Sequence, residues 1–290
     1  MAKEPTTPEK KAPTKPTVER QADGTIKITL TLSQEAIATT GTAVIDHLAK
    51  QTNVAGFRPG KAPTEVAASH LNPEAIREEI LKRLLPQAYM EAVEEHKLKP
   101  IMNPKMQVEK IEEGKDWIFN ALTAEMPEVN PGSYKKNVQG VTAKSKIVIP
   151  GKEEASKKPP LEEVMKAILS DAKVQVPAVL IDQEADRLLS QLLNDIKRLG
   201  LSLDQYLGTT NRKPEDLRLE YAKRAEEDIK LEFVLQKIAE LEKVTVEEKE
   251  IEEAITKAKD PAERQSMEAN RYLLAGILRQ QKTLDLLMNL

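Results

Sequence analysis

Residues 25–32 read TIKITLTL, and this stretch decides the fold class of the N-terminal half. Its apolar residues occupy every second position: Ile26, Ile28, Leu30 and Leu32. Threonines and a lysine fill the alternate positions, which predicts a strand with one buried face. Ser33 then offers an N-cap for a helix that runs to about Lys50.

The chain continues with the signals of a second helix and two more strands. Asn72-Pro73 predicts a helix that extends to about Lys97, and Pro86 predicts a kink or a break inside it. Residues 106–126 resemble two strands joined by a turn, with Trp117 as a core or sheet-edge anchor. We therefore expect a small antiparallel sheet packed on helices, which is an α+β unit.

Beyond residue 160 the apolar residues recur every three or four positions, so residues 161–290 are predicted to be all-α. A short helix is expected at residues 161–172. Three later helices should begin at Pro177, at Pro214 and at Asp260-Pro261, the last running on to the C-terminus. Two further signals are Gly200 as a C-cap, and Thr245 with Glu248 as a capping box for another helix. The wide apolar faces fit either an ordinary helical bundle or a scaffold that leaves apolar surface open to a partner.

Two segments lack such patterns. Residues 1–17 are rich in Pro, Thr and Lys, so we expect a disordered tail and no secretory signal. Residues 136–160 are rich in Lys, Gly and Pro, apart from a short strand-like run at residues 147–149, and are predicted to be a linker. The predicted domains are accordingly residues 18–135 and residues 161–290.

Composition excludes several classes of function. The 290 residues contain no cysteine, which rules out disulfides and thiolate chemistry, and no apolar run approaches the length of a membrane span. Three isolated histidines and an acidic helix face at residues 247–255 give no metal site, and no catalytic or nucleotide-binding motif is present. Residues 1–158 carry 24 basic and 21 acidic side chains, and residues 159–290 carry 20 and 26, so a general nucleic-acid binder is not indicated.

The stretch GFRPGKAP, residues 56–63, stands out against this background. Its glycines and prolines predict a stiff projecting turn that loses little entropy on binding. Phe57 would supply an apolar anchor, while Arg58 and Lys61 could meet phosphate or acidic groups. With Lys50 nearby and no acid among residues 50–61, the loop points to one local anionic contact.

This loop resembles the Gly-Phe-Arg-x-Gly-x-x-Pro signature of the trigger factor family of ribosome-associated chaperones. The matching residues are Gly56, Phe57, Arg58, Gly60 and Pro63. Pro59 replaces the usual lysine, which Lys61 partly compensates. The resemblance extends to residues 84–93, 126–135 and 175–189.

The resemblance implies a ribosome-binding domain at residues 18–135 and an elongated helical chaperone domain at residues 161–290. It implies a cytoplasmic, ATP-independent chaperone without cofactors. Such a protein docks on rRNA and ribosomal protein of the large subunit near the exit tunnel, through the loop at residues 56–63, and shields nascent polypeptides. The sequence does not decide client preference, arm geometry, the effect of Pro59, or whether a homodimer forms.

Full-length family members carry a prolyl-isomerase domain between these two regions. Residues 136–160 are too few to fold as an independent domain, so we expect a compact form that is not an enzyme. Two alternatives remain open, a prolyl isomerase by family label and a ribosome-docking factor that binds no clients.

Overall fold

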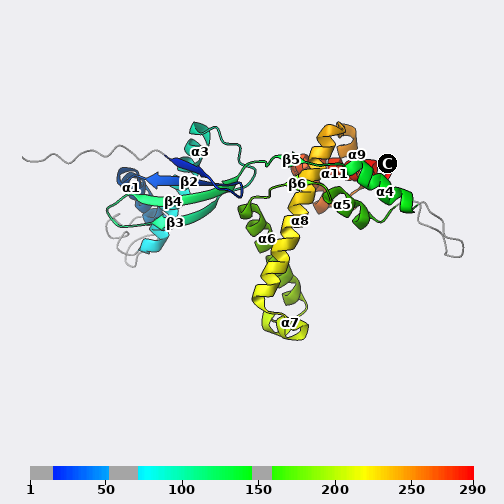
Figure 1. Cartoon of the computed structure of the whole chain (residues 1–290). Helices are drawn as coiled ribbons and strands as arrows, with labels where there is room; N and C mark the ends of the chain where they lie inside the picture. Colours follow the sequence, from blue (N-terminus) through cyan, green and yellow to red (C-terminus); the bar gives the residue numbers. More distant parts are fainter. Residues whose placement is uncertain (1–15, 52–70, 146–158) are drawn as a thin grey trace, which may run out of the picture. The chain divides into compact units, whose positions relative to one another are not determined.

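The computed structural model describes residues 16–51, 71–145 and 159–290. The chain divides into two compact units, unit 1 at residues 1–126 and unit 2 at residues 127–290 (Figure 1). The division falls nine residues before the boundary predicted from the sequence at residue 135. Among the described residues no helix combines the length and apolarity needed to cross a membrane.

Unit 1 is built on a four-stranded antiparallel sheet in the order β1-β2-β4-β3. Its strands are β1 (Thr17–Arg20), β2 (Thr25–Leu32), β3 (Lys105–Lys110) and β4 (Trp117–Ala124). The predicted alternation in β2 is confirmed, since its four aliphatic side chains are buried and pair with β4, as Leu30 does with Phe119. The strand β1 was not predicted, and Thr17 belongs to it and not to a disordered tail.

Two helices cover the apolar face of this sheet, α1 (Gln34–Gln51) and α3 (Pro73–Glu95). The predicted caps are confirmed, because Ser33 Oγ accepts the N–H of Ala36 at 3.3 Å and the Asn72 side chain accepts that of Glu74. Of the kink or break predicted at Pro86, the break is wrong, since α3 is continuous through this residue, and the kink stays a prediction. Neighbouring Leu84, Leu85 and Ala88 all pack on the core, and this tertiary packing holds the helix together.

Trp117 takes the anchoring place that was predicted for it. Its ring is buried in the core of unit 1, and its Nε1 donates to the carbonyl of Glu112 at 3.2 Å. The turn between β3 and β4 therefore lies against the ring that begins β4.

Unit 2 includes a helix where a linker was expected. Residues 134–145 form a helix, α4 (Tyr134–Ser145), whose Val138 is fully buried in the core of this unit. The prediction of a linker over residues 136–160 is thus wrong for residues 136–145. Its strand-like run at residues 147–149 lies outside the described residues. Three aliphatic or aromatic side chains, Tyr134, Val138 and Val141, recur at helical spacing among the lysines and supply the apolar face.

A two-stranded pairing joins the start of unit 2 to the segment after α5 (Leu161–Leu169). The strand β5 (Val129–Asn130) pairs antiparallel with β6 (Lys173–Val174). The helices α4 and α5 pack against each other and against α11, and α5 also packs against α8, so both helices are fixed on the same core.

The longest helix, α8 (Pro214–Leu241), runs beside α6 (Ala178–Arg198), and α7 (Leu203–Thr210) follows α6 in the chain (Figure 1). Pro214 starts α8 as predicted, and Pro177 is the N-cap of α6. Gly200, with φ of +75°, lies just beyond the end of α6 in the left-handed region, as a C-cap glycine does. The short helix α7 was not predicted, although Ser202 and Gln205 form a capping box for it.

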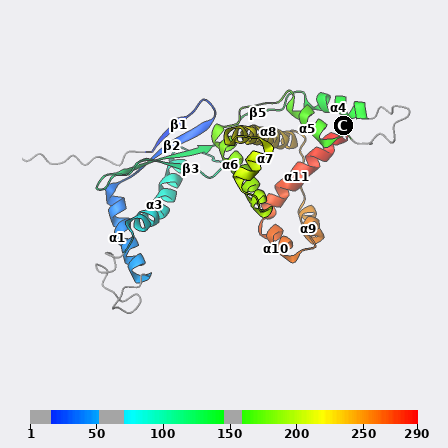
Figure 2. The same ribbon diagram turned by 90° about the horizontal axis from the view of Figure 1, so that it is seen from below.

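The remaining helices are α9 (Glu248–Lys257), α10 (Pro261–Ala269) and α11 (Arg271–Met288), which Figure 2 shows from below. Asp260 caps α10 as predicted. The prediction of one continuous last helix is wrong. Asn270 adopts a non-helical conformation (φ −120°, ψ 40°) and separates α10 from α11. The capping box of α9 is formed by Glu247 and Glu250, and not by Thr245 and Glu248.

Candidate functional site

The sequence-predicted loop lies outside the described residues. None of Gly56, Phe57, Arg58, Pro59, Gly60, Lys61 and Pro63 is placed, because residues 52–70 are not described. The structure describes the helices on either side of them in the sequence, α1 and α3. Val44 and Ile80 are buried between these helices, and Gly41 allows Ile80 to approach closely.

An apolar groove lies in unit 2 between α8 and α11. We call it the α8–α11 groove, and its volume is about 600 Å³. One wall is a helical stripe on α8, and residues 244–246 contribute to the floor. The other wall is α11, where Tyr272 is 95% exposed, Leu273 is 64% exposed and Ile277 is 54% exposed. Large apolar side chains exposed together in this way are typical of a binding surface.

The groove opens because the N-terminal part of α11 is covered on one face only. Toward its C-terminus, Leu284 and Leu287 pack in the core formed with α8, α4 and α5. Toward its N-terminus, Leu274 and Leu278 turn to α9 and α10 instead. The adjacent face of the same turns carries Leu273 and Ile277, and these side chains are exposed beside α8.

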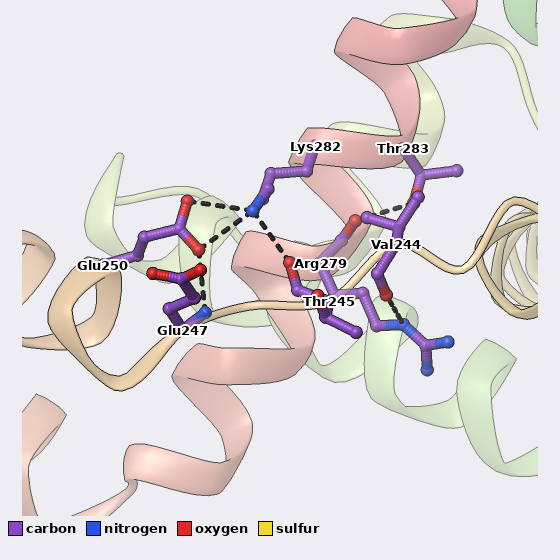
Figure 3. A network of polar contacts seen from close by, with 7 residues as sticks. All are labelled: Val244, Thr245, Glu247, Glu250, Arg279, Lys282 and Thr283. Atoms are coloured by element: carbon purple, nitrogen blue, oxygen red, sulfur yellow. Dashed lines mark hydrogen bonds and ion pairs between the residues drawn. The ribbon is translucent and has the colours of Figure 1, made fainter.

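A polar network holds the floor of the groove against α11 (Figure 3). Lys282 Nζ donates to the carbonyl of Thr245 at 2.7 Å and to both carboxylate oxygens of Glu250 at 2.9 Å. Arg279 Nε donates to the carbonyl of Val244 at 2.9 Å. These bonds fix residues 244–245 in an extended path, which is why α9 begins after Glu247 and not at the predicted Thr245.

The electrostatics of this region follow from the same contacts. The pKa of Glu250 lies below its usual value because the backbone N–H of Glu247 and then the ammonium of Lys282 stabilise the carboxylate. In the groove wall, the pKa of Glu232 lies above its usual value, because desolvation and then the nearby Glu184 disfavour its charge. Among the described residues, Glu232 is the one acidic side chain that lines the α8–α11 groove.

The arrangement suits the binding of an apolar segment. The groove offers apolar side chains, two glutamines, Glu232 and Arg279, and the described residues contain no group of three potential metal ligands. Adaptable aliphatic surfaces of this kind can accept varied apolar segments. The described part of the chain therefore presents a candidate polypeptide-binding groove.

The sequence had indicated only the possibility of open apolar surface in this half. Ile277 lies on the last predicted helix, and its side chain is half exposed in the groove. Tyr272 and Leu273 were not singled out. Their signal was the adjacency of Tyr272-Leu273-Leu274, because three consecutive apolar residues cannot all face one side of a helix.

Comparisons with known proteins bear on both units. Residues 14–158 match the family model described as "Bacterial trigger factor protein (TF)", and residues 148–289 match that of the "Bacterial trigger factor protein (TF) C-terminus". Curated trigger factors of Staphylococcus epidermidis and Staphylococcus aureus are each 38% identical to this chain over 108 residues. That match covers 37% of this chain and 25% of each relative.

A solved structure described as "Promiscuous Substrate Recognition in Folding and Assembly Activities of the Trigger Factor Chaperone" has the same fold. It aligns with a TM-score of 0.59 and 13% identity, over 94% of this chain and 99% of that one. At this identity the likeness is one of fold alone, and it agrees with the α+β unit and the helical unit described above.

Proposed function

This chain belongs to the trigger factor family, and we propose that it is an ATP-independent chaperone of the cytoplasm. In this proposal it docks on the large ribosomal subunit near the exit tunnel and shields nascent polypeptides. The observation that carries the client-binding half is the α8–α11 groove, with Tyr272, Leu273 and Ile277 exposed along one helix. Burying such side chains against an apolar client segment is favourable by about 25 cal/mol per Å².

A direct test of client binding is delayed aggregation of a chemically denatured protein, without nucleotide. We expect the wild-type chain to delay aggregation at several-fold molar excess. The double variant Tyr272→Ser with Leu273→Ser should lose most of this effect, because it removes the exposed apolar wall. Leu219→Ser is the matched control, since Leu219 is also exposed but does not line the groove.

The docking half of the proposal rests on the loop at residues 56–63 and on the family. Phe57 provides the apolar anchor, while Arg58 and Lys61 meet rRNA phosphate or acidic protein groups, with Pro59 stiffening the turn. Truncation of such anchors often costs about 2 kcal/mol each. Phe57→Ala with Arg58→Ala should therefore weaken binding roughly a thousandfold, as measured by co-sedimentation with large subunits.

The matched control for docking is Arg198→Ala with Leu199→Ala, which removes one basic and one apolar residue that are exposed in unit 2. It should co-sediment like the wild type, and binding of both should weaken as salt rises. A folded loop variant that binds normally would contradict the role of the loop. A chain that co-sediments but never delays aggregation would instead be a docking factor without clients.

The proposal includes no catalysis. The two family models that match are those of the N- and C-terminal regions, and they meet at residues 148–158. We therefore expect cis/trans exchange of a short proline peptide to proceed at its uncatalysed rate. A clear acceleration by the purified chain would overturn this part of the proposal.

A further inference from the structure

Unit 1 carries a second apolar groove, between α3 and the start of β3. We call it the α3–β3 groove, and its volume is about 400 Å³. Its apolar lining consists of Leu81, Leu85, Pro86, Tyr89, Met90 and Met106. Met90 is 62% exposed, so the groove is open to solvent and not part of the closed core.

One side of this groove is an edge of the sheet. Among the described residues β3 has a strand neighbour on one side only, which is β4. Alternate residues of β3 therefore turn backbone N–H and C=O groups outward, where another strand could pair with them. Val108, in the middle of β3, is 63% exposed.

The other side of the groove offers one more backbone acceptor. Pro86 has no N–H, so the carbonyl of Lys82, one turn earlier in α3, lacks its helical partner. Lys82 and Pro86 both line the groove.

The charges around the groove also restrict what it can hold. At the rim, Glu78 and Lys82 form an ion pair of 2.8 Å and neutralise each other. Lys105, at the start of β3, forms no ion pair with the described residues. The groove is therefore complementary to an uncharged apolar segment. Lys105 is exposed on β3 beside the groove, where it can pair with an acidic residue at the end of a segment aligned along this strand.

We propose that the α3–β3 groove binds an extended segment of an unfolded polypeptide, which adds as a strand to the outer edge of β3. Its alternate side chains enter the groove and its backbone pairs with the edge. A helical partner would leave the edge of β3 unpaired, because the backbone groups of a helix are already bonded. The occupant's class rests on the proposed chaperone function, but the site is distinct from the α8–α11 groove.

The test uses the full chain and a ten-residue peptide that alternates valine with threonine, ends in aspartate and carries a benzophenone group. Photo-crosslinks mapped by mass spectrometry should fall on α3 and β3. Two further peptides carry backbone N-methyl groups, one on the valines and one on the threonines. Because only one edge of the peptide faces β3, one of them should bind at least tenfold more weakly and the other like the parent.

Met90→Glu should weaken binding of the parent peptide to α3 and β3 at least tenfold, because the substitution places a charge in the groove. Met126→Glu is the matched control, an exposed methionine of unit 1 outside the groove, and should have no effect.

Equal binding of both N-methylated peptides would overturn strand addition. Crosslinks confined to α8 and α11 would overturn the inference while leaving the proposed function intact. A peptide-free dimer that Met90→Glu dissociates would make a second copy the occupant and overturn it too.

Discussion

The two units handle the same kinds of apolar residues in different ways. In unit 1, the inward side chains of β2 and β4 are all buried beneath α1 and α3. In unit 2, a single helix, α11, carries both Leu287 in the core and Tyr272 almost fully in solvent. The difference follows from geometry, because a sheet face is covered as a whole, whereas a helix stripe is covered only as far as its neighbour runs alongside. The central strands β2 and β4 therefore form a closed core, whereas the N-terminal part of α11 leaves apolar side chains open to solvent.

The strongest way to test this contrast is a cavity in the closed core. Phe119→Ala should destabilise unit 1 by about 3–5 kcal/mol, because Phe119 is fully buried between β2 and the helices. Fluorescence of Trp117, the only tryptophan and a residue of unit 1, should report an earlier unfolding transition. Circular dichroism, which is dominated by the helices of unit 2, should change little. Equal shifts in both signals would show that the units unfold as one.

The next effect concerns the proline inside α3. Pro86→Ala should stabilise unit 1 by about 2 kcal/mol. Inside a helix, proline is about 3 kcal/mol less favourable than alanine, but it also restricts the unfolded chain, which offsets about 1 kcal/mol of that cost. Pro73→Ala at the first turn of the same helix is the control and should change stability little. Denaturant unfolding followed by Trp117 measures both. A loss of stability in Pro86→Ala would mean that ring contacts outweigh the missing hydrogen bond.

A smaller effect is expected where α4 is anchored in unit 2. Tyr134 is buried and donates its hydroxyl to the carboxylate of Glu242 at 2.6 Å. Burial and then Glu242 raise the pKa of Tyr134, so the hydroxyl stays a donor at neutral pH. Tyr134→Phe should destabilise unit 2 by about 1.5 kcal/mol, measured by circular dichroism in denaturant. Tyr272→Phe, which alters an exposed ring, should leave the transition unchanged, and equal effects would contradict the anchoring of α4.

The smallest effect tests the wall of the open groove. Because the folded-state pKa of Glu232 is raised above its usual 4.5, its charge disfavours the folded state at neutral pH and has no effect once it is protonated. Glu232→Gln should therefore melt slightly higher than the wild type at pH 7, and the difference should vanish as the pH falls to about 4. Glu226→Gln, which changes an acid of the same helix that does not line the groove, is the control and should melt like the wild type at both pH values. A gain that persists at pH 4 would exclude charge as its cause.

Local signals in the sequence were enough to predict much of the fold. The alternation in β2, the Ser33 and Asn72 caps and the start at Pro214 each depend on neighbouring residues, and the structure confirms them. The start of α9 could not be predicted in this way. It depends on Lys282, thirty-seven residues from Thr245 in the sequence, which holds the carbonyl of Thr245 in place.

The open groove could not be predicted for a similar reason. Periodicity places Leu274 and Ile277 on apolar turns of a helix, but it does not say where the partner of that helix ends. The exposure of Tyr272 and Leu273 depends on the separation of α11 from α8 toward its N-terminus. The loop at residues 56–63 shows the opposite case. Its role was predicted from its residues and the family resemblance, it lies outside the described residues, and it stays a prediction.

The pairing of β5 with β6 has a consequence for how chains of this kind can change length. The helices on either side of residues 146–158, α4 and α5, are fixed by their own packing and by this short ladder. A module gained or lost between them would leave every one of those contacts in place. Each doubling of such a loop costs only about 0.6 kcal/mol. The ladder thus makes the junction a tolerant point for insertion and deletion, at the position where full-length relatives were expected to carry a further domain.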